Sequence, residues 1–562
     1  MSRFILVLIL VAATSFASVT PLKEHQKPHS VWKHKPLEHR GFSGPFDEHL
    51  NQRLNTDDSG EIQNEEQVCI NPLDPDNMVA VWRDFREGYR RCGVGYTLDG
   101  GTTWHDTLFP QMYYAWQSDP TLAVDHNGVF TANVISFEEG GNTDNGLLSV
   151  SSYDGGVTWQ DSVWGMLTTD ESSFEDKQMF AIDNSPDSPY QGTHYLAWAR
   201  FYRNPDTGNY DSTHINLVYK RPGEAYAPPQ IISDTRSVQW ANVATGPNGE
   251  VYLTWGSYSN DAIMFSRSLD GGTTWTAEDD LFPTSFTSAN IEPALLVFSY
   301  MVMAVDNTTG PNRGRIYALY TNDNATHDHT EVFFTRSDNH GDTWTTPVLI
   351  DDENRAYPVD QFHPWISVDE AGRVWCAWYD RRNDPNNLLM DVYFTVSEDG
   401  GQTWRANERI TEVSCNPGAG TLDAGLIGEY IGWHASADKA VCVWTDTRLG
   451  DQDAFVAIID SVFEPNAAAD PFNIHPSSFI LSAAFPNPFN GSTTLSYSLT
   501  SPADVSLTVY NTLGQQVLRS NLGYRASGTH THALELSEPS GVYFAKLSAG
   551  SEQAMAKLLL MR

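Results

Sequence analysis

The sequence has few cysteines, few basic residues and no long apolar segment, and each shortage excludes a class of protein. Five cysteines in 562 residues are too few for a disulfide-stapled scaffold, and no Cys-x-x-Cys pair offers a thiolate zinc site. Only 34 Lys and Arg stand against 71 Asp and Glu, a formal net charge of −37. A nucleic-acid partner or an anionic membrane is therefore not expected. No run reaches the roughly 18 apolar residues of a membrane span.

What is present suits a β protein. Charged residues make up only 19% of the chain, whereas aromatic residues reach 12% and 41 glycines are available for turns. This composition predicts a turn-rich, all-β fold with a packed interior, too long for one ordinary core. Cys69 and Cys92 could pair after export, and the odd cysteine count leaves at least one thiol outside any intramolecular bridge.

The amino-terminal residues predict export. Arg3 precedes an apolar run over residues 4–13 and a small-x-small pattern that ends at Ala17, as in a secretory signal peptide spanning residues 1–17. Residues 18–60 form a polar leader. Four of its histidines could hold a metal ion: His25, His29, His34 and His39. No second type of metal ligand is spaced with them, so a solvated leader is favoured over a metal site.

One eight-residue pattern recurs through the middle of the chain. Thr97–Trp104 reads Thr-Leu-Asp-Gly-Gly-Thr-Thr-Trp, related copies begin at Ser152, Ser268 and Ser397, and a variant carries Asn339 in place of the aspartate. In such a turn the aspartate accepts hydrogen bonds from backbone amides, glycine supplies a positive φ, and the tryptophan packs under the loop. The pattern resembles the Asp-box (BNR repeat) of sialidase-like β-propellers. This resemblance implies the fold more strongly than the chemistry.

Short strand-like runs give the number of repeats. Runs that mostly end in an aromatic residue recur 52 to 66 residues apart, with ends at Trp82, Val134, Trp198, Trp255, Tyr320, Trp378 and Trp444. Repeats of this length with several strands are typical of propeller blades. Seven blades over residues 61–465 are favoured. A six-bladed ring with one repeat outside it is the alternative.

The carboxyl-terminal part forms a separate unit. Residues 466–477 look like a linker, and residues 478–562 combine Phe485-Pro486-Asn487-Pro488-Phe489-Asn490 with alternating strands such as residues 505–510. This part resembles the C-terminal sorting domain of type IX-like secretion systems, a small immunoglobulin-like β-sandwich. The resemblance implies delivery outside the cell or to the cell surface of a Gram-negative-type bacterium. The secretion machinery would then be one partner.

The turns after the aromatic-ended strands supply the candidate site, because propellers usually bind ligands on that face. The segments that enter the blades add Asp119, Asp176, Gln361, His363, Glu429 and Tyr430. A sialidase-like site needs arginines for a carboxylate, a tyrosine with a neighbouring acid as nucleophile, and an acid/base carboxyl. Carried onto this sequence, the resemblance implies Asp84, Glu429 and Tyr430 as catalytic residues, and Arg83, Arg381, Arg448 and Asp380 as substrate-binding residues.

Two functions remain open from the sequence. The first is a secreted, sialidase-like exo-glycosidase acting on anionic extracellular glycans or glycoproteins. The second is a non-catalytic propeller that binds carbohydrate or protein at the cell surface. The segment Gln67-Val68-Cys69-Ile70-Asn71-Pro72 stands where sialidases carry a Phe/Tyr-Arg-Ile-Pro motif, which favours the second over a true sialidase. No cofactor is expected. Structural calcium in Asp-rich turns would be the exception, although no EF-hand spacing is present.

Overall fold

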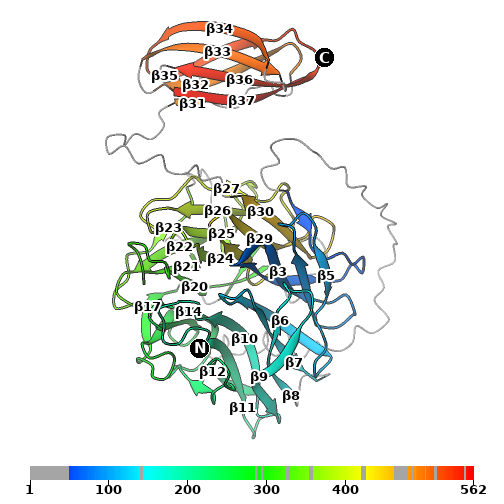
Figure 1. Ribbon diagram of the computed structural model, residues 1–562, viewed down its shortest axis with the longest axis vertical. Helices are drawn as coiled ribbons and strands as arrows, with labels where there is room; N and C mark the ends of the chain where they lie inside the picture. Colours follow the sequence, from blue (N-terminus) through cyan, green and yellow to red (C-terminus); the bar gives the residue numbers. More distant parts are fainter. Residues whose placement is uncertain are drawn as a thin grey trace. The chain divides into compact units, whose positions relative to one another are not determined.

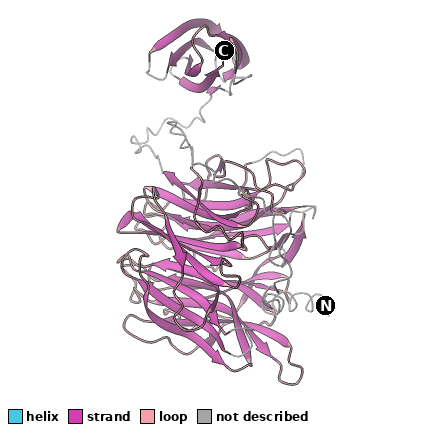
Figure 2. Cartoon of the chain, turned by 90° about the vertical axis from the view of Figure 1, so that its right-hand side faces the viewer, coloured by secondary structure: helices cyan, strands magenta, loops and turns pink. Residues whose placement is uncertain are grey.

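The computed structural model describes residues 50–138, 144–284, 288–292, 295–323, 329–352, 359–418, 426–460, 479–481, 487, 489–499, 502–511, 515–549 and 552–561. All regular secondary structure in these segments is β-strand. None of the segments therefore includes a helix long and apolar enough to cross a membrane. The chain divides into two compact units, residues 1–462 and 463–562 (Figure 1, Figure 2). The predicted signal peptide, most of the predicted leader and the predicted linker at 466–477 lie outside the described residues.

The described part of the first unit contains seven four-stranded antiparallel sheets and one two-stranded hairpin. Blade 1 contains β2 (Gln63–Asn71), β3 (Asp74–Asp84), β4 (Arg91–Thr97) and β5 (His105–Leu108). Blade 2 contains β6 (Trp116–Val124), β7 (Phe130–Phe137), β8 (Asp144–Ser152) and β9 (Gln160–Thr169). Blade 3 contains β10 (Ser173–Ile182), β11 (His194–Arg203), β12 (Tyr210–Lys220) and β13 (Gln230–Ile231).

The remaining blades follow the same plan. Blade 4 contains β14 (Val238–Thr245), β15 (Val251–Ser257), β16 (Ala262–Ser268) and β17 (Asp279–Pro283). Blade 5 contains β20 (Met301–Val305), β21 (Ile316–Asp323), β22 (Thr330–Ser337) and β23 (Val348–Leu349). Blade 6 contains β24 (Gln361–Val368), β25 (Val374–Asp380), β26 (Asp391–Ser397) and β27 (Glu408–Arg409). Blade 7 contains β28 (Gly432–Ala435), β29 (Lys439–Asp446), β30 (Asp453–Asp460) and β1 (Gln52–Arg53).

The blades close into a ring. The first strands of the blades contact one another in the cyclic order β2, β6, β10, β14, β20, β24, β28 and back to β2. Figure 1 shows the sheets fanned around a common centre, with the blue amino-terminal strands beside β29 and β30. The seven-bladed propeller predicted from the repeat spacing is therefore confirmed over the six-bladed alternative. A two-stranded hairpin, β18 (Ser288–Ile291) and β19 (Leu295–Phe298), is inserted between blades 4 and 5.

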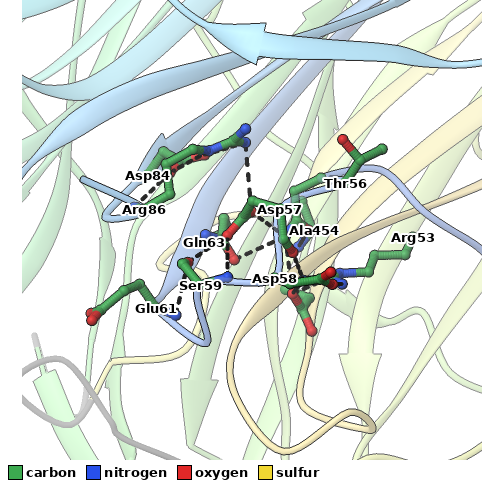
Figure 3. Close-up of polar contacts among 12 residues, drawn as sticks. Arg53, Thr56, Asp57, Asp58, Ser59, Glu61, Gln63, Asp84, Arg86 and Ala454 are labelled. Atoms are coloured by element: carbon green, nitrogen blue, oxygen red, sulfur yellow. Dashed lines mark hydrogen bonds and ion pairs between the residues drawn. The ribbon is translucent and has the colours of Figure 1, made fainter. Parts of the chain in front are cut away.

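The ring is closed by the amino-terminal strand. β1 pairs antiparallel with β30, so blade 7 joins residues from both ends of the unit. Within β1, the Arg53 guanidinium pairs with the Asp453 carboxylate at 2.7 Å, and Arg53 Nη2 donates to the Asp57 carbonyl at 2.6 Å. The polar contacts around Asp57 lead on to Arg86 in blade 1 (Figure 3). The propeller thus begins at Gln52, earlier than the predicted boundary at residue 61. The sequence did not indicate the closing strand because it has only two residues.

The recurring eight-residue pattern forms the predicted turn. In blade 4, Asp270 Oδ1 accepts hydrogen bonds from Ser268 Oγ and from the Thr274 amide, each at 2.8 Å. Gly272 has a φ of 85°, and a Cβ added there would lie 3.1 Å from Tyr195 of blade 3. Glycine is therefore required both by the turn and by the close approach of the preceding blade. These hydrogen bonds lower the pKa of Asp270 against the opposing effect of burial.

The second unit is a β-sandwich of two sheets. One sheet contains β31 (Phe479–Leu481), β32 (Ser492–Leu499) and β35 (Gly528–Glu535). The other contains β34 (Gln516–Arg525), β33 (Ala503–Asn511), β36 (Gly541–Ala549) and β37 (Glu552–Leu560). Alternate residues of β33 and β36 are buried, including Val505, Leu507 and Leu547. This period-two burial is what the alternating sequence predicted.

The five cysteines are all buried and all free. A Cys69–Cys92 disulfide is absent, although the sequence allowed one. Cys69 is in the innermost strand of blade 1 and its Sγ contacts the Leu122 carbonyl of blade 2, while Cys92 is in β4 of blade 1. Both thiols fill the core between blades 1 and 2, and burial raises the pKa of each. They behave as small apolar side chains.

Candidate functional site: a ring of side chains on the propeller axis

Five of the seven innermost strands carry the same irregularity. Each has a β-bulge near its start, and within each bulge one residue other than glycine has a positive φ between 47° and 63°. The five residues are Glu65, Asp119, Lys177, Trp240 and His363. A bulge re-aims side chains, and a positive φ costs conformational energy in residues other than glycine. Five such positions at one level of the ring mark it as a candidate site.

The other two blades place a tyrosine at the same level. Tyr300 lies directly before β20, and Tyr430 lies two residues before β28. Together with the five bulge residues they form what we call the axial ring: Glu65, Asp119, Lys177, Trp240, Tyr300, His363 and Tyr430. All seven side chains are buried, from 0 to 9% exposed. The ring therefore takes one side chain from each blade.

Lys177 is the centre of the acidic side of the ring. Its Nζ lies 3.0 Å from Glu65 Oε1 and 3.0 Å from Asp119 Oδ2, and it also contacts the Glu429 carboxylate. The same ammonium lies 5.5 Å from the centroid of the Trp240 ring. Burial alone would lower the pKa of Lys177, but the carboxylates of Asp119 and Glu65 outweigh it and raise that pKa. Lys177 is thus held as a cation.

Glu65 joins this cation to a tyrosine and an arginine. The Tyr430 hydroxyl donates to Glu65 Oε2 at 3.5 Å, and Arg83 Nη1 lies 3.2 Å from Glu65 Oε1. Burial opposes ionisation of Glu65, yet Arg83 and Lys177 lower its pKa, so it is a carboxylate at neutral pH. Burial raises the pKa of Tyr430 well above its usual value, which keeps the hydroxyl protonated.

Two buried acids next to the ring are shifted in the opposite direction. Burial and, to a smaller extent, the nearby Asp119 raise the pKa of Asp176 to about 7. Gln239 Nε2 donates to Asp176 Oδ2 at 2.6 Å. Burial also raises the pKa of Glu66 to about 8, although the Thr445 hydroxyl donates to its carboxyl group. Beside the ionised Glu65, the cluster therefore contains two carboxyls, those of Asp176 and Glu66, whose pKa values are raised toward or above neutral pH.

The opposite side of the ring is aromatic. The rings of Trp240 and Tyr300 stack with centroids 5.5 Å apart, and those of Tyr300 and His363 stack at 6.1 Å. The Tyr300 hydroxyl donates to the Glu429 carbonyl at 2.9 Å. The buried ring thus has carboxylates on one side and flat rings on the other, and these groups match the hydroxyls and the C–H faces of a sugar.

Three of the predicted site residues belong to a repeated structural motif instead. In blades 1, 6 and 7 the sequence Trp-x-Asp-x-Arg ends the second strand, and the aspartate accepts a bond of 2.8–2.9 Å from the tryptophan Nε1. The same aspartate pairs with the arginine at 2.7–2.8 Å. Asp84, Asp380 and Arg448 are members of this motif. The structure engages them within their own blades and does not bring them to the axial ring.

Arg381 is also engaged elsewhere. It is fully buried, and its Nη1 donates to the carbonyls of Glu292 at 2.6 Å and Asn387 at 2.8 Å and lies 3.3 Å from Asp360. Its guanidinium thus holds the β18–β19 hairpin against blade 6. The predicted set of three arginines around one substrate carboxylate is not assembled, since only Arg83 reaches the ring.

Arg83, Glu429 and Tyr430 are brought together, but in different pairs from those expected. Glu429 contacts Lys177, and the acid beside the Tyr430 hydroxyl is Glu65. The sequence interpretation did not include four members of the candidate ring: Glu65, Lys177, Trp240 and Tyr300. Their signal was positional: each lies just before the regular part of a first strand, at the level of Asp119 and His363. No set of three or more His, Cys, Asp or Glu in the described part of the chain is arranged to hold a metal ion.

Comparisons with known proteins identify the second unit. Residues 483–561 match the family model described as "Secretion system C-terminal sorting domain". Among solved structures, the chain is similar to a protein of unknown function from Dyadobacter fermentans, at 13% identity, 74% coverage of this chain, 100% of that chain and a TM-score of 0.42. It is also similar to the Hadza microbial sialidase Hz136, at 15% identity, 73% coverage of this chain, 68% of that chain and a TM-score of 0.40.

A third similar structure is an α-L-arabinofuranosidase from Fusarium graminearum, at 11% identity, 74% coverage of this chain, 98% of that chain and a TM-score of 0.41. The sorting domain assigns a destination to the protein, outside the cell or on the cell surface of a Gram-negative-type bacterium. The chain is thus a seven-bladed β-propeller followed, at residues 483–561, by a secretion system C-terminal sorting domain.

Proposed function

We propose that the protein is an exported glycoside hydrolase whose reacting groups lie at the axial ring. One observation carries the proposal: the Tyr430 hydroxyl contacts an ionised carboxylate, Glu65, while the pKa of the neighbouring Asp176 is raised to about 7. Two acids whose pKa values are driven apart in one site are what acid–base catalysis at a glycosidic bond requires.

The chemistry would run in two steps. Glu65 takes the proton of the Tyr430 hydroxyl as the tyrosine oxygen bonds to the anomeric carbon, and the protonated Asp176 gives its proton to the leaving glycosidic oxygen. In the second step Asp176, now ionised, takes a proton from water, whose oxygen displaces the tyrosine, and Glu65 returns the proton to the tyrosine oxygen. The sugar is released with its anomeric configuration retained.

The variants Tyr430→Phe and Asp176→Asn test this assignment. Purified protein is incubated with a panel of neutral and acidic oligosaccharides, and released reducing ends are measured. Each variant should lose about 100-fold or more in rate while remaining folded. Tyr317→Phe is the matched control, because Tyr317 is a fully buried tyrosine of blade 5 outside the ring. Unchanged hydrolysis in Tyr430→Phe would exclude the tyrosine as nucleophile.

A non-catalytic, glycan-binding propeller is the second candidate. It is favoured by the burial of the whole ring and by the pairing of its charged side chains with one another, as in a structural core. Under this function no panel member is cleaved, and the main effect of Tyr430→Phe is on the unfolding temperature. Product formation by the wild-type protein, lost in Asp176→Asn, would rule it out.

A further inference from the structure

His363 is the member of the axial ring whose two ring nitrogens make no hydrogen bond within the described structure. Its side chain is fully buried, and neither Nδ1 nor Nε2 has a hydrogen-bond partner among the described residues. Its φ of 48° adds backbone strain. A buried donor or acceptor without a partner is costly, so a histidine held there at the expense of stability needs a reason outside the fold itself.

The groups that surround His363 are mostly rings. It stacks on Tyr300 at 6.1 Å, and Phe362 and Tyr379 present their rings at 5.2 Å and 6.4 Å. Burial, together with the positive charge of Lys177, lowers the pKa of His363 to about 3, so the imidazole is neutral. A neutral imidazole has one N–H donor and one nitrogen acceptor. A sugar hydroxyl, which both donates and accepts, is the complement of such a pair.

We propose that His363 is the recognition group for a neutral sugar residue, bound by its hydroxyls at His363 with a face against Trp240 and Tyr300. This inference rests on the proposed function for the location of the glycan, and it names the substrate class. It differs from the anionic glycan expected from the sequence.

The charges of the ring favour the neutral class. Lys177 is paired with carboxylates on two sides, and Arg83 lies 3.2 Å from Glu65. A substrate carboxylate could reach these cations only by displacing the acids that now hold them, and it would approach Glu65, Asp119 and Glu429. A hydroxyl-rich, uncharged ring meets no such repulsion and could donate to those carboxylates.

The test compares sugars that differ only in charge. Calorimetric titrations of the full chain in an Asp176→Asn background use galactotriose against trigalacturonic acid, with arabino-, xylo- and mannotriose as further neutral probes. We expect at least one neutral trisaccharide to bind and trigalacturonic acid not to bind. His363→Phe, which keeps a flat ring and removes both nitrogens, should weaken that binding about tenfold or more.

Stability provides an independent measurement. Because His363→Phe removes two unpartnered polar atoms from the interior, its unfolding temperature should equal or exceed that of the parent protein. His434→Phe is the control: His434 is a partly buried histidine of β28 whose Nδ1 accepts a bond from the Ile70 amide at 3.4 Å. That variant should unfold at a lower temperature and bind the trisaccharide normally.

The outcomes separate this inference from the proposed function. Hydrolysis or binding of a neutral sugar that is unchanged in His363→Phe, or binding of trigalacturonic acid alone, would overturn the role of His363 and leave the hydrolase standing. Binding that depends on His363 without any hydrolysis by the wild-type protein would uphold the inference and exclude the hydrolase. A lower unfolding temperature with unchanged binding would make His363 a structural residue.

Discussion

At the scale of single residues, the same charged side chains occur in two different roles. Asp84, Asp380 and Asp446 each bind the tryptophan and the arginine of their own strand end, and all three are fully buried. Glu65 and Asp119 are equally buried but point to the axis, where they hold Lys177. A buried ion pair is costly to break, so substitution of either kind of residue should lower the free energy of unfolding. Only substitution of the residues that hold Lys177 should also lower activity.

Replacing Asp380 with alanine separates these roles. Asp380→Ala removes the carboxylate that lies 2.8 Å from the buried Arg382 guanidinium and leaves it paired with the half-exposed Asp352, so we expect a loss of about 3 kcal/mol in the free energy of unfolding. Urea unfolding followed by tryptophan fluorescence measures it. The control is Asp58→Ala, because the Asp58 side chain is fully exposed and its removal should leave the free energy of unfolding nearly unchanged. Unchanged stability with lost glycan turnover would instead return Asp380 to the substrate-binding role.

Glu66 should make stability depend on pH. Its pKa is raised to about 8 by burial, whereas in the unfolded chain it ionises near the ordinary value of 4.5. Between these two pH values the folded state holds a proton that the unfolded state has lost, so this group lowers stability as the pH rises. Glu66→Gln removes the dependence. Its unfolding temperature relative to the wild type should increase from pH 5 to pH 9, and a constant difference would contradict the shift.

At the scale of elements, the regular parts of the blades could be predicted and the irregular parts could not. The recurring Asp-Gly-Gly turns and the aromatic-ended strands are local patterns, and the spacing of the strands predicted seven blades. The bulges at Glu65, Lys177 and Trp240 depend on how seven first strands meet at one axis, which no local pattern encodes. Hydrogen-bond partners are equally non-local: the sequence made Glu429 and Tyr430 candidates, but their contacts with Lys177 and Glu65 come from other blades.

The hairpin β18–β19 gives an element-scale prediction. Arg381 holds it through the Glu292 carbonyl at 2.6 Å, and Phe298 at its end packs on Trp240 with ring centroids 4.2 Å apart. In Arg381→Ala, the amides of Leu295–Phe298 should exchange with deuterium at least about tenfold faster, because the attachment to blade 6 is lost. Peptides from β15, in the interior of blade 4, serve as the internal control. Equal exchange at Leu295–Phe298 in the two proteins would show that Phe298 alone fixes the hairpin.

At the scale of the whole molecule, closure of the ring depends on a very short strand. The two residues of β1 complete blade 7, and Arg53 and Asn55 both contact Asp453 of β30. The sequence around residue 52 has no strand pattern, since two residues are too few to show one, and for this reason the boundary was predicted too late. The contacts that close the ring join residues about 400 positions apart.

Removal of the closing strand should therefore destabilise the propeller as a whole. A chain that begins at residue 60 lacks Arg53 and Asn55 and leaves Asp453, a buried carboxylate, without either partner. Breaking a buried pair in this way costs about 3–5 kcal/mol, to which the lost strand pairing adds. Arg53→Ala should give part of the loss, and removal of residues 479–562 should leave the unfolding temperature of the propeller unchanged, because the two units are separately compact. If the chain beginning at residue 60 unfolded at the wild-type temperature, the contacts of β2 with β28, β29 and β30 would be sufficient to close the ring.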